Sequence, residues 1–259
     1  MDTHPERPIG CQGCRDGQAL DFDLRVAFQP ILDLHREVPF AYEALVRGPD
    51  GQGAGWVLAQ VTEANRYAFD QACRVAAIRQ AVAAGLLDTD ARLSINFLPN
   101  AVYSPQACIR LTLATAAECS LPADRLIFEF TENEQLDPGH VRGIIDAYRA
   151  LGFATALDDF GAGYAGLGLL ADIATDLVKI DMALVRGIES DVRRCRIVGA
   201  MVRLCEEMAI GLIAEGIETE SELAVLRDLG IRYVQGYLIA RPELGRLPLA
   251  SAQAVQRAA

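Results

Sequence analysis

Short apolar segments of β-strand composition recur along the chain and alternate with segments of helical periodicity. Eight segments are near-continuously apolar, as strands buried on both faces should be. They are Leu24–Leu32, Phe40–Arg47, Leu93–Phe97, Leu126–Thr131, Ala154–Asp158, Leu177–Asp181, Ile210–Ala214 and Tyr233–Leu238. Apolar residues at helical spacing fill the gaps over Phe69–Leu86, Pro105–Cys119, His140–Leu151, Met182–Met208 and Ser221–Leu229. Strands that alternate with helices predict parallel βα units.

The first connection departs from this pattern. Only Asp33–Pro39 separates the first two strands, whereas parallel neighbours need a crossover of about a dozen residues or more. These two strands are therefore expected to be antiparallel. Eight strands with one reversed predict a closed barrel with an irregular start. An open doubly wound sheet is the alternative, but the Gly-rich phosphate loop that usually follows its first strand is absent here.

Local signals mark several helix ends. Thr219 and Glu222 have the spacing of an N-cap and its capping-box partner. Gly85, Gly152 and Gly230 follow helical segments in the manner of C-cap glycines. These signals support the predicted helices on either side of the strands.

The length of 259 residues suits one barrel domain. Residues 1–20 are polar and rich in Gly, Pro and Cys, and are predicted to be a flexible tail. The barrel is predicted to span 21–248, and 249–259 to be a C-terminal tail. For the Cys11/Cys14 pair, a disordered tail is favoured over a metal or redox site, because no second pair completes a zinc ligand set.

Charge and cysteine content restrict the class of protein. The formal net charge of -11 argues against binding a DNA or RNA polymer, which needs clustered Lys and Arg. Seven cysteines, mostly scattered through predicted helices, indicate reduced thiols and a cytoplasmic location. The first residues lack an apolar segment, so no secretory signal is expected. No apolar run approaches the roughly 20 residues of a membrane span, so no membrane association is expected.

Polar side chains stand at or just after the ends of seven successive strands. They are Glu43 with Arg47, Asn96, Glu129 with Glu132, Asp158 with Asp159, Lys179 with Asp181, Glu215 with Glu218, and Gln235. In a barrel the carboxyl ends of the strands converge on one mouth, where catalytic sites are built. A single acid in such a place is more often a helix cap or a solvated loop residue. The recurrence on successive strands weakens that interpretation.

Clustered carboxylates raise one another's pKa unless cations separate them. Oxygen ligands from Glu43, Asn96, Glu129, Asp158 and Asp159 would suit Mg²⁺, Mn²⁺ or Ca²⁺ rather than structural zinc. The adjacent Asp158 and Asp159 could hold two ions, a known arrangement for phosphodiester cleavage. The sequence therefore predicts a divalent metal site at the mouth of the barrel.

The same residues carry a family resemblance. Glu43-Ala44-Leu45 with Arg47 resembles the signature of the EAL family of cyclic di-GMP phosphodiesterases. Further motifs occur in the expected order: Phe28-Gln29-Pro30-Ile31, Ser94-Ile95-Asn96, Phe128-Glu129-Phe130-Thr131-Glu132, Asp158-Asp159-Phe160-Gly161-Ala162-Gly163-Tyr164, Lys179-Ile180-Asp181, Ala214-Glu215-Gly216-Ile217-Glu218 and Gln235-Gly236-Tyr237. The resemblance covers residues 22–244.

The resemblance implies a TIM-like (β/α)8 barrel with its first strand antiparallel, and hydrolysis of cyclic di-GMP to linear pGpG. It implies two Mg²⁺ or Mn²⁺ ions, with Ca²⁺ expected to inhibit, and a homodimer. The implied metal ligands are Glu43, Asn96, Glu129, Asp158, Asp159 and Glu215. Lys179 resembles the catalytic lysine, with Asp159 and Glu215 as further catalytic residues. The implied substrate contacts are Gln29, Leu45, Arg47 and Gln235, and the loop-stabilising residues are Glu132 and Glu218.

Two sites in the motifs depart from the commoner family pattern. Gly48 stands where a bulky residue is frequent, and Ala165-Gly166 replaces a usual serine pair. Neither change removes a candidate metal ligand. Two other functions stay open: a cyclic di-GMP receptor without catalysis, and a protein-interaction regulator.

Overall fold

The strands of the chain close into a ring. The computed structural model describes residues 20–131, 137–162 and 166–250. Its nine strands form one sheet in the order β2-β3-β4-β5-β6-β7-β8-β1-β9, and β1 also pairs with β2. The strands are β1 (Arg25–Asp33), β2 (Val38–Arg47), β3 (Arg92–Asn96), β4 (Leu126–Thr131), β5 (Ala154–Phe160), β6 (Leu177–Ile180), β7 (Gly211–Ala214), β8 (Tyr233–Val234) and β9 (Glu243–Leu244). The alternative of an open sheet is therefore wrong.

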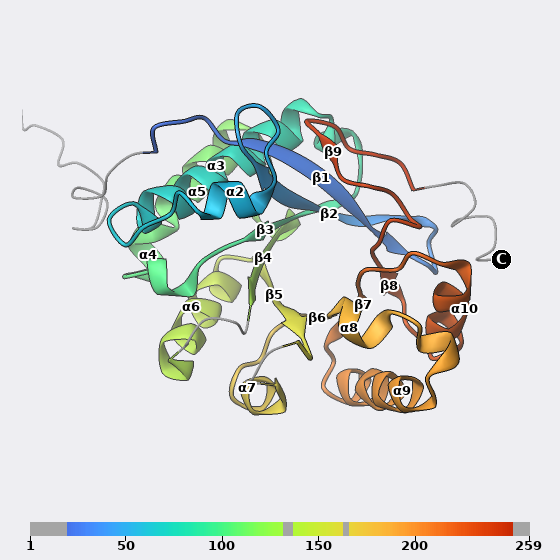
Figure 1. Cartoon of the computed structure of the whole chain (residues 1–259). Coiled ribbons are helices and arrows are strands. Elements are labelled where there is room, and N and C mark those ends of the chain that lie inside the picture. Colours follow the sequence, from blue (N-terminus) through green and yellow to red (C-terminus); the bar gives the residue numbers. More distant parts are fainter. Residues whose placement is uncertain (1–19, 132–136, 163–165, 251–259) are drawn as a thin grey trace, which may run out of the picture.

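The helices lie outside the ring of strands (Figure 1). They are α2 (Ala54–Leu58), α3 (Arg66–Ala83), α4 (Pro105–Cys108), α5 (Arg110–Glu118), α6 (Pro138–Ala150), α7 (Gly166–Asp172), α8 (Met182–Val185), α9 (Val192–Glu207) and α10 (Glu220–Asp228). In the part of the chain that the structure describes, none of them is both long and apolar enough to cross a lipid bilayer.

The first strand runs against its neighbours, as predicted. β1 is antiparallel to both β2 and β8, whereas the pairs from β2–β3 to β7–β8 are parallel. The short connection between β1 and β2 leaves no room for a crossover helix, and this forces the reversal. The fold is thus a TIM-like barrel with an antiparallel first strand.

An apolar layer fills the interior of the barrel on the side away from the mouth. Ile31, Ala41, Ile127, Ala156, Leu177 and Ile213 come from six strands and pack into one buried cluster. Successive side chains on a strand point to opposite faces, so residues two apart share a face. The next inward-facing side chain on each of these strands, toward the mouth, therefore lies directly above this apolar layer.

The outward-facing side chains of the same strands pack against the helices. Phe128 on β4 contacts Tyr148 of α6, with ring centroids 4.9 Å apart, and Phe153, with centroids 5.1 Å apart. The fully buried Arg74 of α3 lies against these rings, with its guanidinium 5.3 Å from the centre of the Phe128 ring and 5.9 Å from that of Tyr148. It forms an ion pair with Asp70 at 2.8 Å. The strands are buried on both faces, which explains their near-continuous apolar sequences.

Two predicted helices are each divided in two. The segment Pro105–Cys119 is divided at Ile109 into α4 and α5. The segment Met182–Met208 was expected to be continuous, but α8 ends at Val185 and α9 begins at Val192. Gly187 lies between them with a left-handed φ of 66°, which glycine adopts without a steric penalty. The Asp191 side chain then accepts hydrogen bonds from the amides of Arg193 and Arg194 as the N-cap of α9.

Other boundaries also differ from the expectations. The strand expected at Tyr233–Leu238 is only the two residues of β8. α2, α7 and β9 were not predicted; β9 is two residues long and pairs with Ala27 and Phe28 of β1. The capping box of Thr219 and Glu222 is present at α10. Gly85, Gly152 and Gly230 all have positive φ, as expected of C-cap glycines.

A buried carboxylate closes the base of the barrel. Asp33, at the end of β1, accepts hydrogen bonds from the amides of His35 (2.9 Å) and Arg36 (3.3 Å) and from Arg232 Nη2 (2.7 Å). Burial alone would raise the pKa of Asp33, but Arg232 and the two amides outweigh it and hold that pKa below its ordinary value. This carboxylate joins the β1–β2 turn to the segment that enters β8.

We expect the Asp33→Asn variant to lower the free energy of unfolding by about 1–2 kcal/mol at pH 7, because Arg232 is 44% exposed and solvent screens part of the charge pair. The Asp33 contribution is fully present above the ordinary pKa of about 3.9 and is lost as the pH falls through the lowered pKa. Urea unfolding at pH 7 and pH 3 measures this: the difference in free energy of unfolding between the wild type and Asp33→Asn should be smaller at pH 3. Asp90→Asn, at an exposed pair 3.9 Å from Arg36, is the control and should change little; an equal loss in both variants would contradict the assignment.

Candidate functional site

A polar layer lies above the apolar layer of the barrel. Its side chains follow the apolar ones by two residues along each strand, in the direction of the mouth. They are Gln29, Glu43, Glu129, Asp158, Lys179, Glu215 and Gln235. The register places Gln29 opposite Glu43 and Asn96 opposite Glu129. The closed sheet thus brings together side chains that stand far apart in the sequence.

The Lys179 ammonium is the centre of this layer. Its Nζ lies 2.6 Å from Glu215 Oε1, 3.0 Å from Glu129 Oε2, 3.1 Å from Asp158 Oδ1 and 3.5 Å from Glu43 Oε2. Lys179 is 1% exposed, so these contacts replace its hydration. A buried ammonium is stable only with anionic partners of this kind.

Neutral hydrogen-bonding groups hold the same carboxylates from the side. Asn96 Nδ2 donates to Glu43 Oε1 at 3.1 Å, and Gln235 Nε2 donates to Glu43 Oε2 at 2.8 Å. The Ser94 hydroxyl donates to Glu129 Oε1. The orientations of the Glu43 and Glu129 carboxylates are therefore fixed before any ligand arrives.

The carboxylates outnumber the ammonium, and their pKa values reflect this. Burial, only partly offset by Lys179, raises the pKa of Glu129 to about 8. Burial and the neighbouring Asp158 raise the pKa of Asp159 to about 6. Burial also raises the pKa of Asp158, and that of Glu215 well above its ordinary value. The layer can therefore hold its full negative charge at neutral pH only with additional cations.

In the remaining two groups the pKa shift favours the charged form. Burial would raise the pKa of Glu43, but Lys179, Gln235 and Asn96 outweigh it and the pKa is lowered. Burial would lower the pKa of Lys179, but the surrounding carboxylates raise it well above its ordinary value. Lys179 is accordingly charged across the physiological pH range.

The acids form two groups with the spacing of metal ligands. Among the described residues, Glu43, Glu129 and Asp158 form one group, and Asp158, Asp159 and Glu215 form the other. Within each group the carboxylate oxygens lie within 4.8 Å of one another, and Asp158 belongs to both. Donor sets of oxygen alone fit hard divalent cations.

A backbone irregularity presents the two adjacent aspartates. The register between β5 and β6 shifts between Leu157 and Phe160, and Asp159 has a left-handed φ of 56°. The Asp159 amide donates to Asp158 Oδ1 at 3.0 Å. A regular strand would turn consecutive side chains to opposite faces, whereas this bulge allows both carboxylates to face the mouth.

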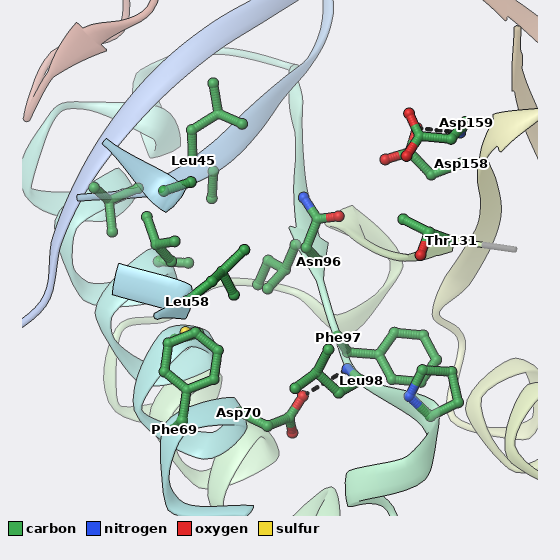
Figure 2. A pocket seen from close by; sticks show the side chains of 18 residues that line it. Leu45, Leu58, Phe69, Asp70, Asn96, Phe97, Leu98, Thr131, Asp158 and Asp159 are labelled. Carbon is green, nitrogen blue, oxygen red and sulfur yellow. Dashed lines mark hydrogen bonds between the residues drawn. The ribbon is translucent and has the colours of Figure 1, made fainter. Parts of the chain in front are cut away.

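Two cavities open beside the acids. A polar cavity of about 320 Å³ is lined by Gln29, Lys179, Arg186, Glu215, Gln235 and Tyr237, among others. An apolar cavity of about 330 Å³ is lined by Leu45, Leu58, Phe69, Asn96, Asp158 and Asp159, among others. Figure 2 shows the two aspartates at one side of the apolar cavity, with the amide of Asn96 between them and the aliphatic wall.

The other residues expected at the site lie as follows. Arg47 ends β2 and donates from Nη1 to the Val46 carbonyl at 2.8 Å, and it lines neither of the two cavities described. The Glu218 carboxylate contacts the Arg186 guanidinium. Glu132, expected to stabilise a loop, lies outside the described residues, as does Ala165.

Sequence reasoning missed three residues near the site. Ser94 precedes Asn96 by two positions, so strand periodicity could have placed both on the inner face. Arg186 and Tyr237 line the polar cavity, and Arg241 lies 4.2 Å from the centre of the Tyr237 ring. Their positions depend on loops without a regular period, so no sequence signal identified Arg186.

The departure at Gly48 has a steric explanation. A Cβ at this position would lie 2.9 Å from the Trp56 ring and 2.4 Å from Gln52 Oε1. Trp56 in turn contacts Phe22, with ring centroids 5.3 Å apart. Glycine at 48 thus makes room for Trp56 to pack at the edge of the mouth.

Comparisons with known proteins agree with this geometry. The chain is 46% identical to a standalone versatile EAL protein from Vibrio cholerae O395, solved in a c-di-GMP bound form; the match covers 91% of this chain and 99% of that one, with a TM-score of 0.87. BlrP1 from Klebsiella pneumoniae, solved as a manganese/cy-diGMP complex, is 34% identical over 88% of this chain and 58% of that one, with a TM-score of 0.81.

The relatives found by sequence include both an antirepressor and a phosphodiesterase. The blue light- and temperature-regulated antirepressor BluF of Escherichia coli is 30% identical over 86% of this chain and 55% of its own length. The cyclic di-GMP phosphodiesterase PdeB of Shewanella oneidensis is 38% identical over 51% of this chain and 15% of its own length. The chain thus spans about half of BluF and a small part of PdeB.

The family assignment rests on the whole barrel. The family model of the EAL domain matches residues 18–242. This range contains every strand up to β8 and all seven members of the polar layer. The chain belongs to the EAL domain family.

Proposed function

We propose that this chain is a metal-dependent phosphodiesterase that hydrolyses cyclic di-GMP to linear pGpG. The observation that carries the proposal is the pair of acidic groups that share Asp158 beside the buried Lys179. Degenerate relatives that only bind a nucleotide are expected to lack an acidic ligand, whereas Glu43, Glu129, Asp158, Asp159 and Glu215 are all present here.

The donor set supports a pair of Mg²⁺ or Mn²⁺ ions. Glu43, Glu129 and Asp158, with Asn96, would hold one ion, and Asp158, Asp159 and Glu215 would hold the other. A bound divalent cation lowers the pKa of water and stabilises charge on a phosphate. The raised pKa values of Glu129, Asp158, Asp159 and Glu215 indicate that this layer favours added positive charge.

Lys179 would serve the reaction through its fixed charge. Its ammonium lies within 3.5 Å of four carboxylates and has no rotational freedom to leave them. A positive group held in this way can orient water and stabilise negative charge on non-bridging phosphate oxygens without reorganising during the reaction. The three histidines are not needed as bases: His35 and His140 lie away from this layer, and His4 lies outside the described residues.

The two cavities support an extended dinucleotide substrate. The polar cavity offers Gln29 and Gln235, and the apolar cavity offers Leu45. Asp158 and Asp159 line both cavities. The relatives from V. cholerae and K. pneumoniae were solved with c-di-GMP, the second also with manganese. A ligand with one phosphodiester at the acids and one base in the apolar cavity would use both spaces.

A regulatory role without catalysis is the second candidate. It is favoured by the name of the E. coli relative BluF, an antirepressor. A cytoplasmic location, a homodimer and inhibition by Ca²⁺ stay predictions, as do the phosphate contact of Arg47 and the loop role of Glu132.

The purified chain is expected to convert cyclic di-GMP to pGpG with Mg²⁺ or Mn²⁺ and to lose that activity in EDTA, because the acidic layer needs cations to bind a phosphodiester. Chromatographic separation of the two nucleotides measures the conversion. Restoration of turnover by added Mn²⁺ is the control. Tight binding without turnover in either metal would favour the receptor, and the absence of both would favour the protein-interaction regulator.

Asp158→Ala and Lys179→Ala are each expected to reduce turnover by at least about 100-fold, the scale on which even the supporting partners of metal ligands act. Asp172→Asn, an exposed acid on α7, is the matched control and should retain activity. A thermal unfolding scan gives a second readout: Mn²⁺ should stabilise the wild type and the control, and should stabilise Asp158→Ala much less. Full activity of either alanine variant would mean that the site is misplaced.

A further inference from the structure

A buried acid outside the polar layer joins two loops at the mouth. Glu222, in the first turn of α10, is 4% exposed. Its Oε2 accepts hydrogen bonds from the amides of Glu218 (2.9 Å) and Thr219 (3.0 Å). Its Oε1 accepts a hydrogen bond from the Gly187 amide at 3.0 Å. A capping box explains the bond to Thr219, but it does not require the contact with Gly187, which belongs to another loop.

The two loops that Glu222 joins carry an ion pair at the rim of the polar cavity. Gly187 follows Arg186, and the Arg186 guanidinium contacts the Glu218 carboxylate. Glu222 therefore holds the backbone on both sides of this pair. A second contact supports the same approach of the loops: a Cβ on Gly216 would lie 2.4 Å from Met182 Cβ.

Arg186 has the chemistry of an anion contact. Among the described residues that line the polar cavity, the basic side chains are Lys179 and Arg186. Lys179 is already surrounded by four carboxylates. Arg186 lines the polar cavity with a side chain that is 36% exposed, so part of it is open to a ligand. A guanidinium in this position beside a layer of acids suits a phosphate oxygen.

The candidate metal ligand three residues before Glu218 does not depend on Glu222. Glu215 is held by Lys179 at 2.6 Å, and its amide donates to the Ile180 carbonyl at 3.1 Å. Loss of the Glu222 carboxylate should therefore release Arg186 and Glu218 while leaving Glu215 in place.

We propose that Glu222 is a positioning residue that fixes Arg186 as a contact for a phosphodiester oxygen of the substrate. The identity of that substrate as cyclic di-GMP rests on the proposed function. The role predicts an effect on substrate affinity rather than on the chemical step, because Glu222 contacts none of the candidate metal ligands in the described structure.

The test uses three variants: Glu222→Ala, Arg186→Ala and the double variant that carries both changes. Thr219→Ala is the control. Calorimetry with cyclic di-GMP and Ca²⁺ gives Kd, and turnover with Mn²⁺ gives KM and kcat. Glu222→Ala and Arg186→Ala should each raise Kd and KM about tenfold, the lower end of the cost of losing a supporting partner, with little change in kcat. The double variant should have the same Kd and KM as Arg186→Ala, because both single changes remove the same contact of Arg186 with the substrate. Glu222→Gln keeps one acceptor oxygen and should recover part of the affinity.

Thr219→Ala is the matched control. It removes the hydroxyl that accepts from the Glu222 amide at 3.2 Å, so it weakens the helix cap without touching Gly187. It should lower the unfolding midpoint, because a cap contributes to helix stability. It should leave Kd nearly unchanged, because the contact of Glu222 with Gly187 remains. An equal rise in Kd for Thr219→Ala would show that Glu222 acts only as a cap, and additive effects in the double variant would also overturn the proposal.

Hydrogen exchange separates this inference from the proposed activity. The Gly187 and Glu218 amides should be protected in the wild type and in Thr219→Ala, and should exchange faster in Glu222→Ala. Nucleotide binding without hydrolysis would end the phosphodiesterase proposal while the Kd comparison still decides the role of Glu222. A wild type that binds no cyclic di-GMP would overturn both.

Discussion

The contact of one ammonium with four carboxylates is the constraint on which the mouth of the barrel depends. Lys179 reaches Glu43, Glu129, Asp158 and Glu215, which come from four other strands or strand ends. Its charge compensates only part of theirs, so the layer is stable as a protein interior and still attracts cations. The same imbalance that raises the pKa of Glu129 to about 8 makes the site suitable for divalent metals.

Strand periodicity made much of the site predictable from the sequence. On several parallel strands the inner apolar residue is followed two positions later by a polar one, as in Ile127 and Glu129 or Leu177 and Lys179. Parallel strands in a closed sheet bring such residues to one level. The reversal of β1 was predictable for a different reason, because a connection as short as that before Val38 excludes a parallel crossover.

Features that depend on tertiary closure or on irregular backbone were not predictable. The left-handed Asp159 and the register shift beside it have no sequence period. Arg74 would be placed on a solvated helix face by its charge, yet it is fully buried with its guanidinium 5.3 Å from the centre of the Phe128 ring. Gly187 divides a segment whose apolar spacing resembles one long helix, because a single left-handed residue outweighs the pattern around it.

The reversed first strand has a mechanical consequence. Arg25, where β1 begins, pairs with Arg47, where β2 ends, so the chain enters the barrel at the mouth and not at its base. β9 pairs with Ala27 and Phe28 close by, and Figure 1 shows it lying along β1. Tension applied to the backbone before Arg25 or after Leu244 would thus load the rim beside Gln29 first, and would leave the apolar floor of the barrel unstrained.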